Sequence, residues 1–179
     1  CGYYRTGAMS FVVEDGHGVS DANSYVTVRF ADDFLAYRTD FDWATRTVEQ
    51  KQAALVQATA YVDARYGRLF AGRVATPTQA LAWPRQGAGY DGLPVVLKRA
   101  VALYAAYAVV SPLAPAPATS GGLAQGVVTE KTVGPISKKF AAVTKGYGSQ
   151  IEQWRMLPEP DALINQLISG INAGNRCYR

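Results

Sequence analysis

Hydrophobic side chains recur at helical spacing near the start of the chain. Phe30, Phe34 and Tyr37 lie three or four residues apart and predict a helix over residues 28–38 with these rings on one face. Thr27 directly precedes the segment, and a threonine at this position can cap a helix. The pattern therefore predicts a first helix with an aromatic face.

A second and longer helix is predicted over residues 48–66, where apolar residues form a continuous stripe. Its first residues follow Thr47, and Gln50 stands three positions later. This spacing fits a capping box, in which the threonine hydroxyl accepts the Gln50 N–H and the glutamine side chain reaches back. Gly67 marks the expected end.

A third helix is predicted to begin at Pro94 and to end before Pro112. Residues 100–110 contain only Ala, Val, Leu and Tyr, so this helix is apolar on every face. Such a helix must be buried on all sides, either by its own fold or by neighbouring subunits.

The pattern changes after the third helix. Residues 112–126 are rich in Pro, Ala and Gly and predict a linker. Residues 127–133 and 136–141 then flank Gly134-Pro135 and predict a β-hairpin. A lone hairpin is marginally stable in water, so it should pack on the helices or on a neighbour.

A short helix is expected near the C-terminus, beginning at Pro160. Its apolar face would consist of Leu163, Ile164, Leu167 and Ile168. Because residues 144–157 resemble a loop, this helix is predicted to sit on a flexible arm.

The predicted fold class is therefore α+β, with a mainly helical core of three helices, a β-hairpin and a C-terminal arm that carries a short helix. Residues 1–8 are expected to be upstream or added sequence, because Met9 is a natural start. The remaining divisions are a helical core (9–111), a linker (112–126), a β-hairpin (127–143) and a C-terminal docking arm (144–179).

Composition excludes several classes of function. The 179 residues are 49% hydrophobic and 18% charged, which suits one folded domain rather than a disordered chain. With one histidine, His17, and two cysteines, the chain cannot build a Cys/His zinc site or a convincing nucleophile–base pair. We therefore expect no enzyme activity, no catalytic residues, no metal and no cofactor.

No segment is expected to cross a membrane, because the longest apolar run has eleven residues. The net charge is +4, but it is uneven: residues 9–91 carry −2 and residues 92–179 carry +5. Such a bipolar chain suits head-to-tail packing, although an uneven solvated surface explains it equally well.

Four lysines gather on and just after the predicted hairpin: Lys131, Lys138, Lys139 and Lys145. They form either a charged edge that prevents aggregation or a surface that contacts a nucleic-acid backbone or an acidic rim. Both interpretations remain open from the sequence.

Several motifs in fixed order resemble one known family. They are Ala-Asn-Ser-Tyr at residues 22–25, Leu-Ala-Trp-Pro-Arg at residues 81–85 and Val-Gly-Pro-Ile at residues 133–136, with the capped and the Ala-rich helices between them. Together they resemble the head–tail connector (adaptor) proteins of tailed bacteriophages. Some relatives are labelled DnaT-like single-stranded-DNA-binding proteins. The resemblance covers roughly residues 11–143.

The resemblance implies a structural virion protein. Family members form a ring, typically of twelve copies, that binds below the portal protein, extends the channel for the genomic double-stranded DNA and receives the tail or the next connector protein. This chain would then be part of the virion neck and would assemble in the host cytoplasm, with no membrane partner. The alternative is a replication accessory protein that binds single-stranded DNA.

Individual residues receive expected roles on this basis. Trp154, Leu157, Leu163 and Leu167 are expected to anchor the C-terminal arm on the portal or another partner, because apolar residues on an arm gain most from burial. Lys138 and Lys139 are candidates to face the channel or DNA. Tyr25, Trp83 and Pro84 are expected to anchor the fold. Deleting residues 150–179 should then leave a folded core.

Overall fold

The computed structural model describes residues 10–114 and 155–168, together with four strands between them. The chain divides into two compact units. The first, here called the helical core, combines Cys1–Pro112 with Leu157–Arg179. The second, here called the excursion, is Leu113–Met156. Residues 1–8, predicted to precede the domain, lie outside the described residues.

The first two helices begin where their caps predict. Helix α1 (Val28–Leu35) is capped by the Thr27 side chain, which accepts the Phe30 N–H. Helix α2 (Val48–Tyr66) begins with the predicted capping box. The Thr47 hydroxyl accepts the Gln50 N–H at 3.3 Å, and the Gln50 side chain accepts the Thr47 N–H at 3.1 Å.

Helix α1 is shorter than predicted and buries a different face. The residues that it buries are Ala31 and Leu35, whereas Tyr37 lies beyond the helix and is 96% exposed. Phe30 and Phe34 stack on each other at 6.3 Å between ring centroids and are half-buried. The small Ala31 allows close approach to the core, so the large aromatic rings flank the contact instead of forming it.

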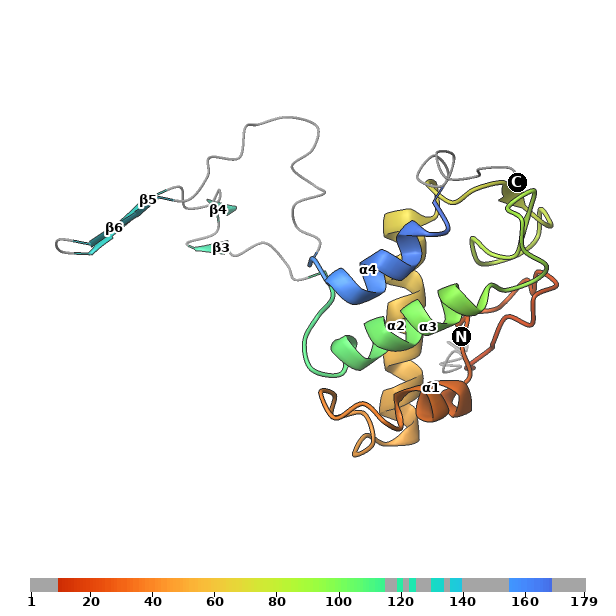
Figure 1. Cartoon of the computed structure of the whole chain (residues 1–179), viewed down its shortest axis with the longest axis horizontal. Coiled ribbons are helices and arrows are strands. Elements are labelled where there is room, and N and C mark those ends of the chain that lie inside the picture. Colours follow the sequence, from red (N-terminus) through yellow and green to blue (C-terminus); the bar gives the residue numbers. More distant parts are fainter. Residues whose placement is uncertain are drawn as a thin grey trace, which may run out of the picture. The chain divides into compact units, whose positions relative to one another are not determined.

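Helix α3 (Val95–Ala108) is the centre of the helical core. It packs on α2, α1 and helix α4 (Pro158–Asn165), and Figure 1 shows α1 and α4 on either side of it. Leu97 and all residues from 100 to 106 are fully buried. The helix that is apolar on every face is therefore covered by its own chain, which decides between the two alternatives left open by the sequence.

A long loop between α2 and α3 carries the short antiparallel strands β1 (Arg73–Val74) and β2 (Arg85–Gln86). Trp83 lies fully buried beneath this loop, with its ring against Phe70 and Tyr90. The Arg85 guanidinium donates to the carbonyl oxygens of Ala71, Gly72 and Ala82 and so ties the loop together.

The excursion contains two further hairpins. Strands β3 (Thr119–Ser120) and β4 (Leu123–Ala124) form one, within the segment predicted to be a linker. Strands β5 (Glu130–Val133) and β6 (Ile136–Lys139) form the other, which confirms the predicted hairpin. In its register, Glu130 lies opposite Lys139 and Lys131 lies opposite Lys138.

The predicted α+β, mainly helical class is confirmed, with one correction. The core contains α4 as a fourth helix, because α4 packs on α3 instead of belonging to a separate arm. Within the described part of the chain, no helix combines the length and the apolar character needed to cross a membrane.

Candidate functional site

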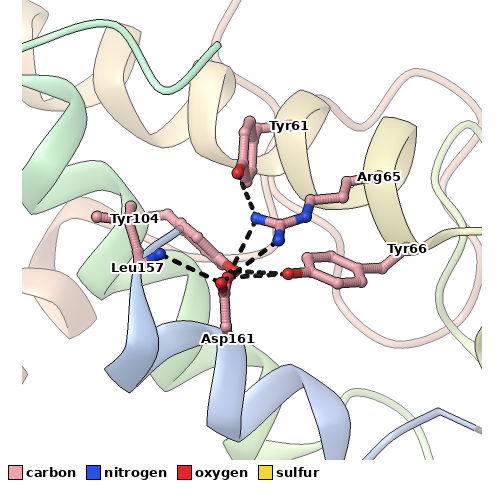
Figure 2. Close-up of polar contacts among 6 residues, drawn as sticks. All are labelled: Tyr61, Arg65, Tyr66, Tyr104, Leu157 and Asp161. Carbon is pink, nitrogen blue, oxygen red and sulfur yellow. Dashed lines mark hydrogen bonds and ion pairs between the residues drawn. The ribbon is translucent and has the colours of Figure 1, made fainter. Parts of the chain in front are cut away.

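A buried carboxylate fastens α4 to the rest of the helical core. Asp161, on the first turns of α4, is 8% exposed. Its Oδ1 accepts hydrogen bonds from the Tyr66 hydroxyl at 2.8 Å and from the Tyr104 hydroxyl. Arg65 approaches both carboxylate oxygens at 3.3 and 3.4 Å. Figure 2 shows these side chains from α2, α3 and α4 converging on one point.

The same carboxylate also closes the start of its own helix, because the Leu157 N–H donates to Asp161 Oδ2 at 3.2 Å. The Arg65 guanidinium is in turn oriented by the Tyr61 hydroxyl at 2.6 Å. Both oxygens of the Asp161 carboxylate thus accept hydrogen bonds from the chain. A carboxylate with its acceptor sites filled in this way is suited to holding helices together rather than to accepting a substrate proton.

The tyrosine hydroxyls around Asp161 resist ionisation. Burial raises the pKa of Tyr104 far above its ordinary value, and its hydrogen bond to Asp161 raises it further. Burial likewise raises the pKa of Tyr66. A phenolate beside a buried carboxylate would place two negative charges in a dry environment, so these phenols remain donors.

The position of α4 corrects the expected docking arm. Leu157 and Leu167 are 4% and 2% exposed, and Leu163 is half-buried. The core of their own chain therefore covers Leu157 and Leu167, whereas Leu163 keeps part of its surface exposed. Trp154, the fourth expected anchor, lies outside the described residues, as do 144–153 and 169–179 of the expected arm.

A second polar network joins the sequence motifs that carry the family resemblance. Tyr25 is buried, and its hydroxyl donates to Asp63 on α2 at 2.6 Å while accepting the Trp83 N–H at 3.1 Å. The other oxygen of Asp63 accepts the Ala82 N–H at 2.9 Å. Pro84 follows in the same loop and is buried. The Tyr25 hydroxyl thus links the loop at Trp83 to Asp63 on α2.

Burial raises the pKa of Asp63, although the donors from Tyr25 and Ala82 oppose this shift. Burial and the adjacent Asp63 charge together raise the pKa of Tyr25 well above its ordinary value. Neither Asp63 nor Asp161 has a sequence signature that predicts its role. Apart from the Leu157 N–H, the donors to these two carboxylates lie far from them along the chain.

A third carboxylate organises the glycine-rich turn near the N-terminus. Glu14 is 3% exposed and accepts the backbone N–H groups of Gly16, Gly18 and Val19, each at 2.9 Å. Its neighbour His17 is exposed. Within the described ranges, no group of three or more His, Cys, Asp or Glu side chains could hold a metal ion.

The lysines expected to face a channel lie on strand β6. Lys138 occupies the register position opposite Lys131, and Lys139 the position opposite Glu130. Successive positions of a strand alternate between the two faces of a ribbon. The two lysines therefore occupy alternate positions of the hairpin rather than equivalent ones.

An open surface lies where α2 begins and α3 ends. We call it the end face and define it by the residues that line a hollow of about 170 Å³. The lining residues are Arg46, Gln50, Ala53, Ala54, Gln57, Ala108 and Val109. The lining combines three alanines and one valine with three polar side chains.

Most charges near the end face are already paired. Arg46 contacts Asp42 at 2.8 Å, and Lys51 contacts Asp32 at 2.8 Å. Glu49 lies in the exposed first turn of α2, where its own backbone N–H and the Thr47 hydroxyl lower the pKa of its carboxyl. Arg46, the charged residue that lines the hollow, is therefore already paired.

Comparison with known families identifies the class to which this fold belongs. Residues 9–179 match the family described as "Putative DnaT-like ssDNA binding protein", so the chain belongs to that family. No curated protein matches the chain, and no solved structure matches it.

Proposed function

We propose that this protein is a structural virion component, a head–tail connector subunit that forms a ring below the portal and extends the DNA channel. The observation that carries the proposal is the excursion. It leaves the core after α3 and returns before α4, and its ends meet where the Arg155 N–H donates to the Leu113 carbonyl at 3.4 Å.

The described strands of the excursion pair only within their own hairpins. A two-stranded hairpin has two edges whose backbone groups can pair with another chain, and it is marginally stable alone. A protein that inserts such hairpins between two buried helices has an element suited to assembly. This feature supports a role in a ring more strongly than α3 does, because α3 is covered within the chain.

We further propose that the protein is not an enzyme and uses no cofactor. Two buried carboxylates, Glu14 and Asp161, and the half-buried Asp63 each accept several hydrogen bonds from the chain itself. Their placement is explained by the joining of loops and helices. We therefore assign the function of the protein to the surfaces of the core and the excursion, through which it would contact other molecules.

The test is to mix the purified chain with the portal protein of its own virus and to measure native mass and image the particles. A closed ring of the chain bound to the portal, typically of twelve copies, is the expected result. A chain that neither binds the portal nor adds a ring to it would contradict the proposal. Tail or further connector proteins should then bind to the ringed portal but not to the bare one.

Binding of single-stranded DNA in replication is the second candidate, and the family description favours it. Against it, the helical core carries 13 basic and 12 acidic side chains, a net charge of only +1. Five of these basic residues pair with carboxylates: Arg29, Arg38, Arg46, Lys51 and Arg65. Such a core offers little to a phosphate backbone.

A salt titration with a labelled oligothymidine separates the two candidates. Submicromolar affinity that falls steeply with salt would favour the replication accessory protein. In that case Lys138→Ala and Lys139→Ala should each weaken binding, whereas Lys51→Ala, which removes an already paired cation, should not. Weak binding with unchanged portal attachment would favour the connector.

A further inference from the structure

The two faces of the β5–β6 hairpin differ in charge. Residues directly opposite each other in an antiparallel ladder share a face, and successive residues of a strand alternate between faces. The register therefore divides the residues of both strands into two sets. The first set, here called the lysine face, consists of Lys131, Lys138, Val133 and Ile136. The second set, here called the mixed face, consists of Glu130, Lys139, Thr132 and Ser137.

The lysine face works against the stability of its own hairpin. Lys131 and Lys138 occupy directly opposite positions, and like charges placed in this way destabilise a ladder. The four positions of this face hold no carboxylate that could compensate them. A two-stranded hairpin is marginally stable in water and has little stability to lose. Residues that weaken their own element in this way are typical of a functional site, here one for an anion.

The mixed face is already balanced in charge. Lys139 lies opposite Glu130, and such an opposite-charge pair stabilises the ladder and adds no net charge. The excursion as a whole has five basic and two acidic side chains, a net charge of +3, and two of these positive charges belong to the lysine face. Lys138 and Lys139 are neighbours in the sequence, but the register gives them different electrostatic surroundings.

Two ammonium groups side by side fit a ligand with closely spaced negative charges. Lysine is a point charge that binds phosphate without reading the bases. Duplex DNA carries one negative charge per about 1.7 Å of its axis, so the distance of about 5 Å between opposite Cβ atoms of a ladder spans several phosphates.

We propose that the lysine face of the β5–β6 hairpin contacts the phosphate backbone of duplex DNA. The proposal rests on the connector function above, in which such DNA passes through the channel. It assigns the contact to Lys131 and Lys138, which lie across the ladder from each other, rather than to the sequence neighbours Lys138 and Lys139.

A nuclear magnetic resonance titration of the isotope-labelled full chain tests this contact. A duplex of about 16 base pairs, added at about 20 mM salt, should shift the amide resonances of β5 and β6, because contacts with phosphates are strongest at low salt. The shifts should disappear when the salt concentration is raised about tenfold, because counterions then compete for the phosphates.

The two neighbouring lysines of β6 provide matched variants. Lys131→Gln and Lys138→Gln should each weaken duplex binding at least about threefold and lower the salt slope by about one, whereas Lys139→Gln should weaken it less than about twofold. The first two variants remove a repulsion across the ladder. Weaker binding by these two variants therefore cannot arise from a less stable hairpin.

Three results would overturn the proposal. The first is a chain whose β5 and β6 resonances do not respond to the duplex at low salt. The second is a Lys139→Gln variant that binds as weakly as Lys138→Gln. The third is equal affinity for a polyglutamate of the same charge, which would assign the lysine face to an acidic protein surface.

The portal experiment separates this inference from the connector function. A Lys131→Gln, Lys138→Gln chain that still forms rings on the portal is the expected result, because the lysine face contacts DNA and not the portal. Rings on the portal together with any of the three contrary results would refute the DNA contact and leave the connector function intact. Duplex binding through Lys131 and Lys138 without rings would support the contact and refute the connector function.

Discussion

Removing the Asp161 carboxylate tests whether α4 is fastened to the core as the structure indicates. In Asp161→Ala the hydroxyls of Tyr66 and Tyr104 lose their buried acceptor, and Arg65 loses its ion-pair partner. The Arg65 and Asp161 side chains are 14% and 11% exposed, so solvent can replace little of what is lost. Breaking a buried pair of this kind costs about 3–5 kcal/mol.

A loss of about 4 kcal/mol is a large fraction of the stability of a typical domain. We expect urea denaturation, followed by far-ultraviolet circular dichroism, to show the transition of Asp161→Ala at much lower urea. Asp33→Ala is the matched control, because Asp33 is 76% exposed and its ion pair with Arg29 spans 3.9 Å. Such surface pairs contribute at most about 1 kcal/mol.

A double-mutant cycle with Tyr104→Phe shows whether the contact itself is responsible. Asp161→Ala, Tyr104→Phe and the double variant should deviate from additivity by at least about 1 kcal/mol, because the two side chains share one hydrogen bond. A cost below about 1 kcal/mol for Asp161→Ala, or strictly additive effects, would refute the role assigned to this cluster.

Three further predictions follow from the geometry. Gly72→Ala should lower the free energy of unfolding by more than Gly87→Ala. Both glycines have a similar positive φ, +74° and +76°, but a Cβ at Gly72 would lie 2.2 Å from the Gln86 carbonyl oxygen, whereas one at Gly87 would meet nothing within 4 Å. Equal unfolding free energies of the two variants would contradict this prediction. Burial raises the pKa of Tyr25, Tyr66 and Tyr104, so these phenols stabilise the fold fully below the unfolded value near 10, and their contribution is lost as the pH rises through the folded values. A tyrosinate absorbance titration should show that these three phenols ionise only as the chain unfolds. Their reversible ionisation near pH 10 in the folded chain would contradict the prediction. Deleting residues 157–179 should abolish cooperative unfolding, because the burial of Leu157, Ile164 and Leu167 stabilises the core by about 1.5–3 kcal/mol each. An unchanged unfolding transition of the truncated chain would show that α4 is an independent arm.

Local patterns predicted the elements that depend on neighbouring residues. The capping box at Thr47 and Gln50 and the β5–β6 hairpin around residues 134–135 both follow from contacts only a few positions apart. The extent of α3 also follows from its sequence, because Pro94 and Pro112 limit it on both sides. The sequence did not show whether α3 is buried by its own chain or by neighbouring subunits, since either removes its apolar side chains from water.

The place of α4 depended on contacts that no local pattern reveals. Its apolar face predicted burial but not the surface that provides it, and we therefore expected docking on a partner. Asp161 meets Tyr66 and Tyr104 across 95 and 57 positions of the chain. Such pairings form only when distant segments fold together, so only the tertiary structure could assign them.

The sequence by itself thus determined which segments are helical, where the hairpin turns and how charge is distributed along the chain. The tertiary structure decided which apolar faces are already covered and which remain open. Burial is a property of the whole fold: the same row of leucines fits a partner's surface or the chain's own core. The end face became visible only once the fold had placed the start of α2 beside the end of α3.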